Sequence, residues 1–285
     1  MKELIILGQG PAGISAALYA VRGGAGVTVI AKDDGALAKA DKIENYYGFE
    51  NGIFAKDLIR AGIQQAKNLG VKFVHAEVCG IEFGENGYDI KTSENQTFHA
   101  ASIVIAVGTS RNTPKIENLQ AFEGKGISYC AICDGFFFRG KKVGVIGNAA
   151  YAFSEYSVLK NIIDDVTILT DGKQPAFSSA NYNPKKIQKF EGNETLERVI
   201  YTDGTEEAFD GIFIACGSAG AFELAKKLGM ETADNKILID EKCATNVPGI
   251  FAAGDCTKGL QQIAKAVYEG MIAGIQAVQY LKTLS

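Results

Sequence analysis

The sequence predicts an α/β fold made of two similar units, each with a buried strand, a glycine-containing turn, a helix and a second strand. The first unit begins at Leu4 and the second at Lys142. Between the two units lies a Cys-x-x-Cys pair, Cys130 and Cys133, which Asp134 follows directly. The 285 residues suffice for about two domains at the usual size of roughly 100–200 residues each.

The composition is that of a globular protein with a sizeable core, because 47% of the residues are hydrophobic and 22% are charged. The net charge of −4 argues against a general nucleic-acid binder, which would be basic. No apolar run approaches the roughly 18 residues of a membrane span, and residues 4–7 are too short for the apolar region of a signal peptide. We therefore expect a cytoplasmic protein, in which a disulfide between Cys130 and Cys133 would be catalytic rather than structural.

The first unit carries the glycine fingerprint of a dinucleotide-binding fold. A buried strand precedes Gly8-Gln9-Gly10-Pro11-Ala12-Gly13, and an amphipathic helix and a second strand at residues 27–30 follow it. In this context Gly8 suits the tight turn, Gly10 the close approach of a pyrophosphate, and Gly13 the packing of helix on strand. The N-terminus of the helix would then face the phosphates. The alternative is a helix cap in a fold that holds no ligand.

The ribose contact of this unit departs from the fingerprint. An acidic residue should end the second strand and hold the ribose, but Ala31 stands there and is followed by Lys32 and Asp33. Asp33 is the nearest substitute, whereas Lys32 could instead bind a phosphate. The residue that holds the ribose therefore stays open.

The chain between the fingerprint and the cysteine pair alternates short elements. The pattern predicts a loop at residues 41–49, an amphipathic helix at 54–69 and alternating strands between 71 and 92. A further buried strand at 103–107 ends at Gly108. The next few residues, up to Pro114, are typical of an interdomain connection.

The second unit has the outline of the first but poor binding chemistry. Ala149 replaces the glycine that lets a pyrophosphate approach the backbone, and its methyl group occupies that space. Asp171, which follows the second strand at residues 166–169, would repel the 2′-phosphate of NADPH, and no arginine cluster follows it. We favour a retained fold without a ligand here, with NADH on Asp171 as the open alternative.

The pattern then predicts hairpin strands at 187–190 and 196–202, a buried strand at 212–216 and helices at 221–228 and 262–281.

The cysteine pair has two interpretations when it is taken alone. Two cysteines separated by two residues can close and reopen a small disulfide, and an acid such as Asp134 can handle the thiol protons. The same spacing occurs in structural zinc sites, which would need two more ligands. The two histidines of the chain, His75 and His99, lie far away in sequence. We therefore expect no metal.

Five motifs in order give the sequence a family resemblance over nearly its whole length. They are the fingerprint at 8–13, Glu44-Asn45-Tyr46-Tyr47-Gly48-Phe49, Ala106-Val107-Gly108, Cys130-Ala131-Ile132-Cys133-Asp134-Gly135-Phe136-Phe137, and residues 247–255, which end in Ala252-Ala253-Gly254-Asp255. Together they resemble a low-molecular-weight thioredoxin reductase. The resemblance implies two Rossmann-like, three-layer ββα nucleotide-binding domains, the second inserted in the first, and a homodimer. The FAD domain would comprise residues 1–112 and 241–285, and the redox-disulfide domain residues 113–240.

The resemblance also implies the cofactor and the site residues. Cys133 would face the flavin of FAD, Cys130 would attack the disulfide of thioredoxin, and Asp134 would be the acid and base for the thiols. Gln262 and Ile263 open a helix whose positive end would face the pyrimidine edge of the flavin. The other positions expected at FAD are Gly8, Gly10, Pro11, Ala12, Gly13, Lys32, Asp33, Leu37, Asn45, Val78, Gly108, Gly254 and Asp255.

The departures from the family pattern indicate a different electron donor. The family's NADPH motifs are replaced by Gly147-Asn148-Ala149 and Thr170-Asp171-Gly172. This combination is similar to the ferredoxin-dependent flavin thioredoxin reductases of clostridia, so we expect reduced ferredoxin as the donor. A ferredoxin near about −400 mV and a thioredoxin near about −270 mV leave about 130 mV, or about 6 kcal/mol for two electrons. We expect the inserted domain to rotate about residues near 112 and 240 between its two partners.

Three alternatives remain beside this hypothesis. The first is an NADPH- or NADH-dependent thioredoxin reductase, and the second is a disulfide reductase for another thioredoxin-like or peroxiredoxin-like partner. The third is a non-catalytic flavin- or zinc-binding module.

Some residues outside the motifs have their own interpretations. The run at residues 136–138 (Phe136, Phe137 and Phe138) suggests either a docking surface for thioredoxin or packing against the neighbouring domain. A basic patch for an acidic ferredoxin would consist of Lys141, Lys142, Lys185, Lys186 and Lys189. Buried, unreactive thiols are expected at Cys79, Cys216 and Cys243.

Overall fold

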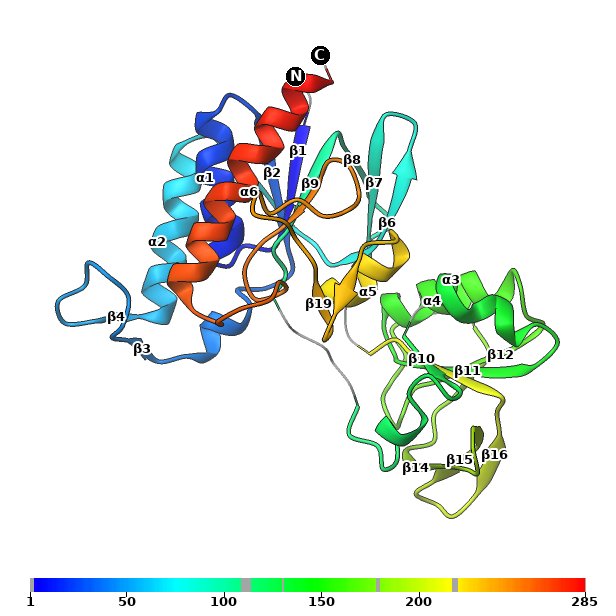
Figure 1. The fold of residues 1–285 in the computed structure, drawn as a ribbon. Helices are drawn as coiled ribbons and strands as arrows, with labels where there is room; N and C mark the ends of the chain where they lie inside the picture. The colour runs from blue at the N-terminus through cyan, green and yellow to red at the C-terminus, as the bar shows by residue number, and fades with distance from the viewer. Residues whose placement is uncertain (1–2, 109–113, 130, 178–179, 217–219, 285) are drawn as a thin grey trace. The chain divides into compact units, whose positions relative to one another are not determined.

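The computed structural model describes residues 3–108, 114–129, 131–177, 180–216 and 220–284, and Figure 1 traces the chain. Its contacts divide the chain into two compact units. Unit 1 consists of residues 1–110 and 220–285, and unit 2 of residues 111–219. The sequence predicts a return to the first domain at residue 241, whereas the contacts already place residues 220–240 in unit 1.

Short elements attach residues 220–240 to unit 1. Helix α5 (Ala221–Lys227) lies near strand β6, and strands β18 (Thr232–Ala233) and β19 (Lys236–Ile237) form a small hairpin. The backbone N–H of Ile237 donates a hydrogen bond to the carbonyl oxygen of Cys256, at 2.9 Å. The hairpin therefore borders the 254–257 loop of unit 1.

A five-stranded parallel sheet forms the centre of unit 1, in the order β20-β9-β1-β2-β5. The last four residues of β1 and the last five of β2 are buried, as expected of a parallel sheet that is covered on both faces. The strands are β1 (Glu3–Leu7), β2 (Gly26–Ala31), β5 (Lys72–His75), β9 (Ser102–Ile105) and β20 (Ile250–Ala252).

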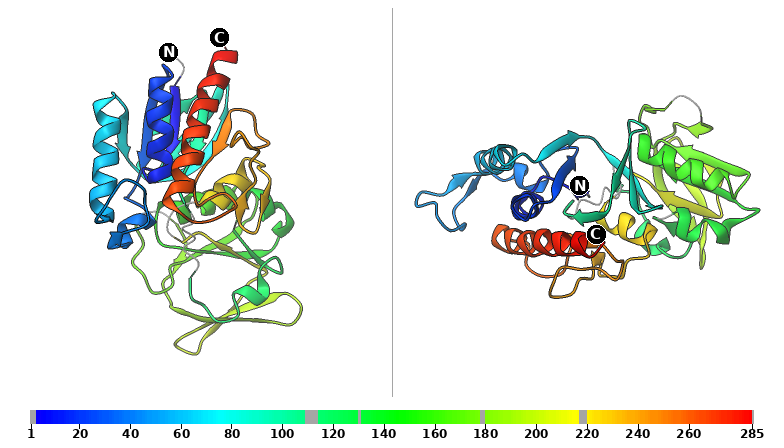
Figure 2. Two further views of the ribbon diagram at one scale, coloured as in Figure 1. Left: turned by 60° about the vertical axis from the view of Figure 1, so that its left-hand side comes forward. Right: turned by 90° about the horizontal axis from the view of Figure 1, so that it is seen from above.

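Helices cover one face of this sheet and an antiparallel sheet lies on its other side, which gives three ββα layers (Figure 1). Helices α1 and α6 lie side by side in Figures 1 and 2. A Cβ added at Gly270 or Gly274 of α6 would lie 2.1 or 2.4 Å from a carbonyl oxygen of α1, so glycine allows this close approach. The layers consist of α1 (Pro11–Arg22), α2 (Ala55–Asn68) and α6 (Ile263–Thr283), and of β6 (Val78–Gly84), β7 (Gly87–Thr92) and β8 (Thr97–Ala100); the peripheral elements are η1 (Ala36–Lys39), β3 (Lys42–Ile43) and β4 (Ile53–Phe54).

Unit 2 repeats the parallel sheet in the order β10-β17-β11-β12-β13. Buried side chains of an adjoining antiparallel sheet, such as Phe190 and Val199, join Ile146 and Leu169 of the parallel sheet in one core. The parallel strands are β10 (Ile127–Ser128), β11 (Lys142–Ile146), β12 (Asp165–Leu169), β13 (Tyr182–Asn183) and β17 (Gly211–Ile214); the antiparallel strands are β14 (Ile187–Gly192), β15 (Leu196–Tyr201) and β16 (Glu206–Ala208). The helical elements are η2 (Gln120–Phe122), α3 (Ala131–Asp134), η3 (Gly135–Phe138) and α4 (Ala150–Lys160). Across the described residues of both units, no helix combines the length and the apolar character that a membrane span requires.

Candidate functional site

The fingerprint turn of unit 1 requires two of its glycines for steric reasons. Gly8 has a φ of +103°, and a Cβ there would lie 2.4 Å from the carbonyl oxygen of Ala106 on β9's continuation. A Cβ at Gly13 would lie only 1.9 Å from the carbonyl oxygen of Gly8. Real Cβ atoms do not approach oxygen so closely, so these glycines allow α1 to pack directly against the turn.

The third glycine of the turn, Gly10, has open space beside it instead of a close contact. Gly10 is the N-cap of α1, and a Cβ added there would find no atom within 4 Å. Among the residues that the structure describes, no side chain caps α1 through a hydrogen bond; Pro11 occupies the start of the helix, and its first turn has no acidic residue. The space beside Gly10 and the uncapped helix end together fit a pyrophosphate, whose negative charge the helix dipole would stabilise.

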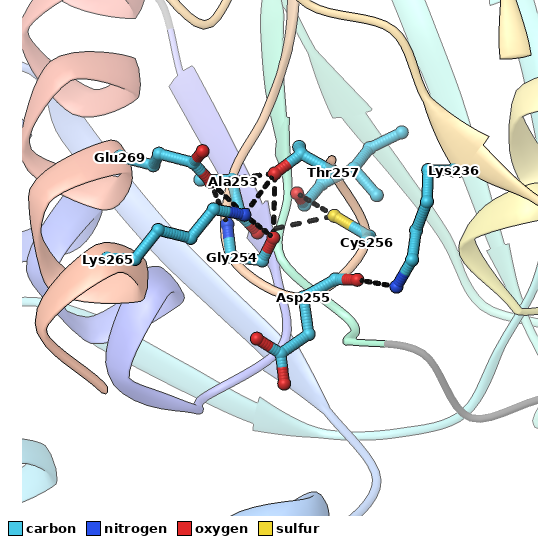
Figure 3. Close-up of polar contacts among 9 residues, drawn as sticks. Lys236, Ala253, Gly254, Asp255, Cys256, Thr257, Lys265 and Glu269 are labelled. Atoms are coloured by element: carbon cyan, nitrogen blue, oxygen red, sulfur yellow. Dashed lines mark hydrogen bonds and ion pairs between the residues drawn. The ribbon is translucent and has the colours of Figure 1, made fainter. Parts of the chain in front are cut away.

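The loop that contains Gly254 and Asp255 lies beside this helix end. A Cβ at Gly254, whose φ is +85°, would lie 2.8 Å from the Cβ of Ala12. The backbone of the loop is held by charged side chains, and Lys236 Nζ donates a hydrogen bond to the carbonyl oxygen of Asp255, at 2.5 Å. The carboxylate of Asp255 points away from these contacts in Figure 3. Asp255 is thus presented by a fixed backbone, with its carboxylate directed elsewhere.

Two predicted residues that are far apart in the sequence come together at the start of α6. Asn45 Nδ2 donates a hydrogen bond to Gln262 Oε1, at 3.1 Å. Gln262 is the N-cap of α6, Ile263 is its first residue, and no side chain caps this helix end through a hydrogen bond. Helix α6 therefore begins, like α1, without a side-chain cap among the described residues, and this helix end lies beside Asn45.

The positions predicted at the adenosine end have local partners in the structure. Asp33 Oδ1 accepts a hydrogen bond from the backbone N–H of Gly35, at 2.8 Å. Lys32 Nζ lies 3.7 Å from Glu77 Oε1. The sequence prediction overlooked Asp34, whose Oδ1 accepts a hydrogen bond from Gln9 Nε2 of the fingerprint turn, at 2.8 Å. The remaining predicted positions are Leu37 in η1, Val78 at the start of β6 and Gly108, which has a φ of +69°.

The corresponding turn of unit 2 is bonded to the chain itself. Ala149 is the N-cap of α4. The carbonyl oxygen of Asn148 accepts a hydrogen bond from the backbone N–H of Ala176, at 2.7 Å, and Asn148 Nδ2 donates one to the carbonyl oxygen of Gln174, at 3.0 Å. Asp171, the candidate for an NADH ribose, accepts a hydrogen bond at Oδ1 from the backbone N–H of Ile187, at 2.9 Å. Asn148 of the turn and the carboxylate of Asp171 are therefore both hydrogen-bonded to backbone groups of unit 2.

The redox pair is described only through its neighbours, since Cys130 and the side chain of Cys133 lie outside the described residues. Asp134 Oδ2 accepts a hydrogen bond from Ser128 Oγ, at 2.6 Å. Glu155, on α4 and only 1% exposed, accepts a hydrogen bond at Oε2 from the backbone N–H of Ala131, at 2.9 Å. The sequence prediction missed Glu155, because a glutamate in a helix normally faces solvent.

Two residues four positions apart on α4 hold the turn around the redox pair. Glu155 binds the backbone at Ala131, and Leu159 packs beneath Gly135, where an added Cβ would lie 2.9 Å from Leu159 Cδ2. Residues four apart on a helix lie on the same face. One face of α4 therefore anchors the peptide on both sides of Cys133.

The three phenylalanines after Asp134 have different surroundings within unit 2. Phe138 is packed against the ring of Phe213, with centroids 5.5 Å apart. Phe136 and Phe137 are 62% and 72% exposed, so packing does not account for them.

The remaining cysteines are unsuited to redox chemistry. Cys79 and Cys243 are buried as predicted, and so is Cys256, whereas Cys216 is only partly buried. Desolvation raises the pKa of Cys79 and Cys216 to about 11 and that of Cys243 and Cys256 to about 12. These thiols are therefore protonated near neutral pH and weakly reactive. Within the described ranges no group of three His, Cys, Asp or Glu side chains could hold a metal ion.

Three of the five lysines predicted as a basic patch have carboxylate partners. The pairs are Lys142 with Glu207 at 2.9 Å, Lys185 with Asp203 at 2.9 Å and Lys189 with Glu191 at 2.7 Å. Their charges are largely compensated within unit 2, which weakens the idea of a patch that attracts an acidic protein.

Known proteins resemble this chain in sequence and in structure. Residues 2–270 match the family model of the pyridine nucleotide-disulphide oxidoreductases. The chain is 31% identical to the thioredoxin reductase of Listeria innocua, over 99% of this chain and 94% of that protein. The crystal structure of the atypical thioredoxin reductase TRi from Desulfovibrio vulgaris Hildenborough is 37% identical, with a TM-score of 0.92 over 99% of both chains. A ferredoxin-flavin thioredoxin reductase from Clostridium acetobutylicum is 28% identical, with a TM-score of 0.70 over 99% of this chain and 98% of that one.

These matches confirm the predicted fold of two Rossmann-like domains and the predicted cofactor, FAD. The clostridial ferredoxin-dependent type is one of several structural neighbours, so the matches define the family but not the electron donor. The chain belongs to the thioredoxin reductases, which are FAD-binding flavoproteins of the pyridine nucleotide-disulphide oxidoreductase family.

Proposed function

We propose that this thioredoxin reductase receives electrons from reduced ferredoxin and passes them through FAD and the Cys130–Cys133 disulfide to thioredoxin. The single observation that carries the choice of donor is the state of the turn in unit 2. Ala149 replaces the glycine that a pyrophosphate would require, and residues 174–176 are hydrogen-bonded to Asn148 of the same turn. We expect the methyl group of Ala149 and this attached segment to hinder a nicotinamide dinucleotide at the helix end.

The charge of unit 2 supports the same donor. NADPH carries a 2′-phosphate that arginine side chains usually bind. Asp171 stands at the end of β12 instead, and its carboxylate accepts the backbone N–H of Ile187. One of the structural neighbours is named as a ferredoxin-flavin thioredoxin reductase, which shows that the fold accommodates this donor in another protein.

The residues of unit 1 fit FAD, and we assign them as follows. The N-terminus of α1, with Gly10 and Ala12, would bind the pyrophosphate, and Asp255 would bind the ribityl hydroxyls. The N-terminus of α6, beginning at Gln262, would stabilise negative charge at the pyrimidine edge. Asn45 would be fixed by its hydrogen bond to Gln262. FAD, when it is bound, accepts electrons singly or in pairs, and it can therefore couple a one-electron donor to a two-electron disulfide.

The thiol chemistry would belong to the redox pair on unit 2. The Cys130 thiolate would attack one sulfur of the thioredoxin disulfide, and a mixed disulfide would form as the second thioredoxin sulfur leaves. Cys133 would then attack Cys130, which releases reduced thioredoxin and closes the Cys130–Cys133 disulfide. Two electrons pass to thioredoxin, and its two new thiols take up two protons. Asp134, held by Ser128, would hold and return one of these protons.

Anaerobic reduction of the flavin distinguishes the donors. The holoenzyme is mixed separately with reduced ferredoxin, NADPH and NADH at equal concentrations, and the loss of flavin absorbance is followed. We expect rapid bleaching with ferredoxin and little change with either nicotinamide nucleotide. Bleaching by NADPH or NADH, with none by ferredoxin, would mean that the donor assignment is wrong.

A Cys133→Ser variant separates the two halves of the reaction. Ferredoxin should still bleach its flavin, because the donor acts before the disulfide, while thioredoxin reduction stops. Loss of both activities would contradict the proposed order of transfer.

The family resemblance also leads us to propose a homodimer, which light scattering of the holoenzyme would test.

A further inference from the structure

Two charged side chains of α6 occupy positions that local helix energetics disfavour. Lys265 lies in the first turn, where the helix dipole repels a cation. Glu269 follows four residues later, at 3.0 Å from the lysine, which is the less favourable order for such a pair. Contacts outside the helix must therefore explain why this lysine and this glutamate stand here.

Those contacts all lie in the 254–257 loop (Figure 3). Lys265 Nζ donates to the carbonyl oxygen of Gly254, at 2.8 Å, and to Thr257 Oγ1, at 2.7 Å. Glu269 Oε2 accepts the backbone N–H of Gly254, at 2.8 Å, and also lies 2.8 Å from Thr257 Oγ1. One ion pair therefore binds both backbone polar groups of Gly254, the residue immediately before Asp255.

The ion pair is shielded from solvent, which strengthens its hold on the loop. The side chains of Lys265 and Glu269 are only 18% and 12% exposed. Hydrogen bonds to charged groups are short and directional, and a buried charge that loses its partner is strongly unfavourable. Lys236 restrains the loop from the opposite side through the carbonyl oxygen of Asp255. The backbone around Asp255 is thus fixed, while its carboxylate remains outside the network.

We propose that Lys265 and Glu269 are positioning residues that hold Asp255 where its carboxylate binds FAD, and that they thereby set the affinity for the cofactor. This inference rests on the function proposed above, because it takes Asp255 as a ligand of FAD. The loop also packs against the first turn of α1 through Gly254 and Ala12. A shift of the loop would therefore disturb the carboxylate and the pyrophosphate helix together.

The test measures FAD binding rather than turnover. The dissociation constant is obtained from the recovery of free-flavin fluorescence on dilution of the holoenzyme. Lys265→Met, which keeps the length of the side chain, and Glu269→Gln should each weaken FAD binding about tenfold, or about 1.4 kcal/mol. The double variant should lose little more than either single variant, because both residues act through one ion pair. The matched control is Lys258→Met, which removes an exposed lysine 3.4 Å from Asp234 and should leave the affinity unchanged.

A second readout separates positioning from general stability. At a fixed concentration of FAD, the stabilisation grows with the logarithm of its affinity, so positioning variants should reduce the rise in Tm that FAD produces. An equal fall in Tm with and without FAD, at an unchanged dissociation constant, would indicate a merely structural pair and overturn the proposal. If Lys265→Met does not fold, Glu269→Asp provides the same test, because it keeps the charge but shortens its reach.

Asp255→Asn distinguishes this inference from the function on which it rests. If that variant weakens FAD binding and Lys265→Met does not, the positioning role is wrong while the assignment of Asp255 stands. If Asp255→Asn binds FAD as tightly as the unmodified protein does, the assignment of Asp255 fails and this inference fails with it.

Discussion

The two glycine turns of this protein share a strand–turn–helix geometry, and they differ at two of the three fingerprint glycine positions. Unit 1 has Gly10 and Gly13 where unit 2 has Ala149 and Ala152. Neither helix end is capped by a hydrogen bond from a described side chain, but in unit 1 the space beside Gly10 is open. In unit 2 the turn is hydrogen-bonded to residues 174–176.

The comparison shows that a helix after such a turn can keep its position beside the parallel sheet while the groups that it contacts differ. The N-terminus of α1 is open beside Gly10, whereas one face of α4 holds a peptide. Glu155 and Leu159 anchor the residues on either side of Cys133. Three experiments on matched positions, and one on the cysteines, test this comparison.

The largest effect is expected from Gly13→Ala. Its Cβ would lie 1.9 Å from the carbonyl oxygen of Gly8, so the turn must move away from α1. Such overpacking should lower the free energy of unfolding by about 3 kcal/mol and abolish FAD binding. Chemical denaturation and flavin content measure both. The matched change in unit 2, Ala152→Gly, should cost only about 1 kcal/mol and leave FAD in place. Equal effects of the two changes would break the comparison.

A smaller, more selective effect is expected from Gly10→Ala. The added methyl group meets no protein atom within 4 Å, and Gly10 has an ordinary φ of −71°, so the apoprotein should fold normally. The methyl group would occupy the space assigned to the pyrophosphate, and FAD binding should weaken at least about tenfold, or about 1.4 kcal/mol. Fluorescence titration of the apoprotein with FAD measures the change. Unaltered affinity would exclude Gly10 from the cofactor site.

Removal of the buried carboxylate of unit 2 should affect the redox pair without touching the cofactor. Glu155→Leu leaves the N–H of Ala131 without its acceptor, which costs about 1–3 kcal/mol. We expect lower stability and slower thioredoxin reduction at an unchanged FAD content. Glu155→Gln keeps an acceptor oxygen and serves as the control. If the leucine variant retains full thioredoxin turnover, α4 does not anchor the redox turn.

The smallest effect concerns the four cysteines outside the redox pair. Burial raises the pKa of these thiols from 9.0 to about 11 or 12, so they lose their protons at a higher pH in the folded protein than in the unfolded chain. Their contribution to stability is complete below pH 9 and is lost as the pH rises toward 12. In a Cys130→Ser/Cys133→Ser variant, a thiol reagent at pH 8 should label none of them until the protein is denatured. Rapid labelling of the native variant would refute their inert role.

The sequence predicted the features that depend on backbone geometry. The fingerprint glycines and the strand at residues 142–146 follow from local pattern, because turn geometry and burial leave regular signals. Strand β8 was not predicted, since its mixed residues Thr97 to Ala100 lack clear alternation.

Side-chain partners that are distant in sequence were beyond such reasoning. Nothing local marks Glu155 as buried, and its role depends on the packing of α3 against α4. Lys185 and Lys142 looked like free surface charges because their partners, Asp203 and Glu207, follow 18 and 65 residues later. The ion pair of Lys265 and Glu269 carried one weak signal, a cation in the first turn of a helix, which only its contacts with the 254–257 loop explain.

The two hydrogen bonds that join Asn148 to residues 174 and 176 have a consequence for engineering this turn. An Ala149→Gly substitution would restore a small residue at the start of α4, but the neighbouring backbone would stay bonded to the turn. We therefore expect that this substitution alone would not give unit 2 a dinucleotide site.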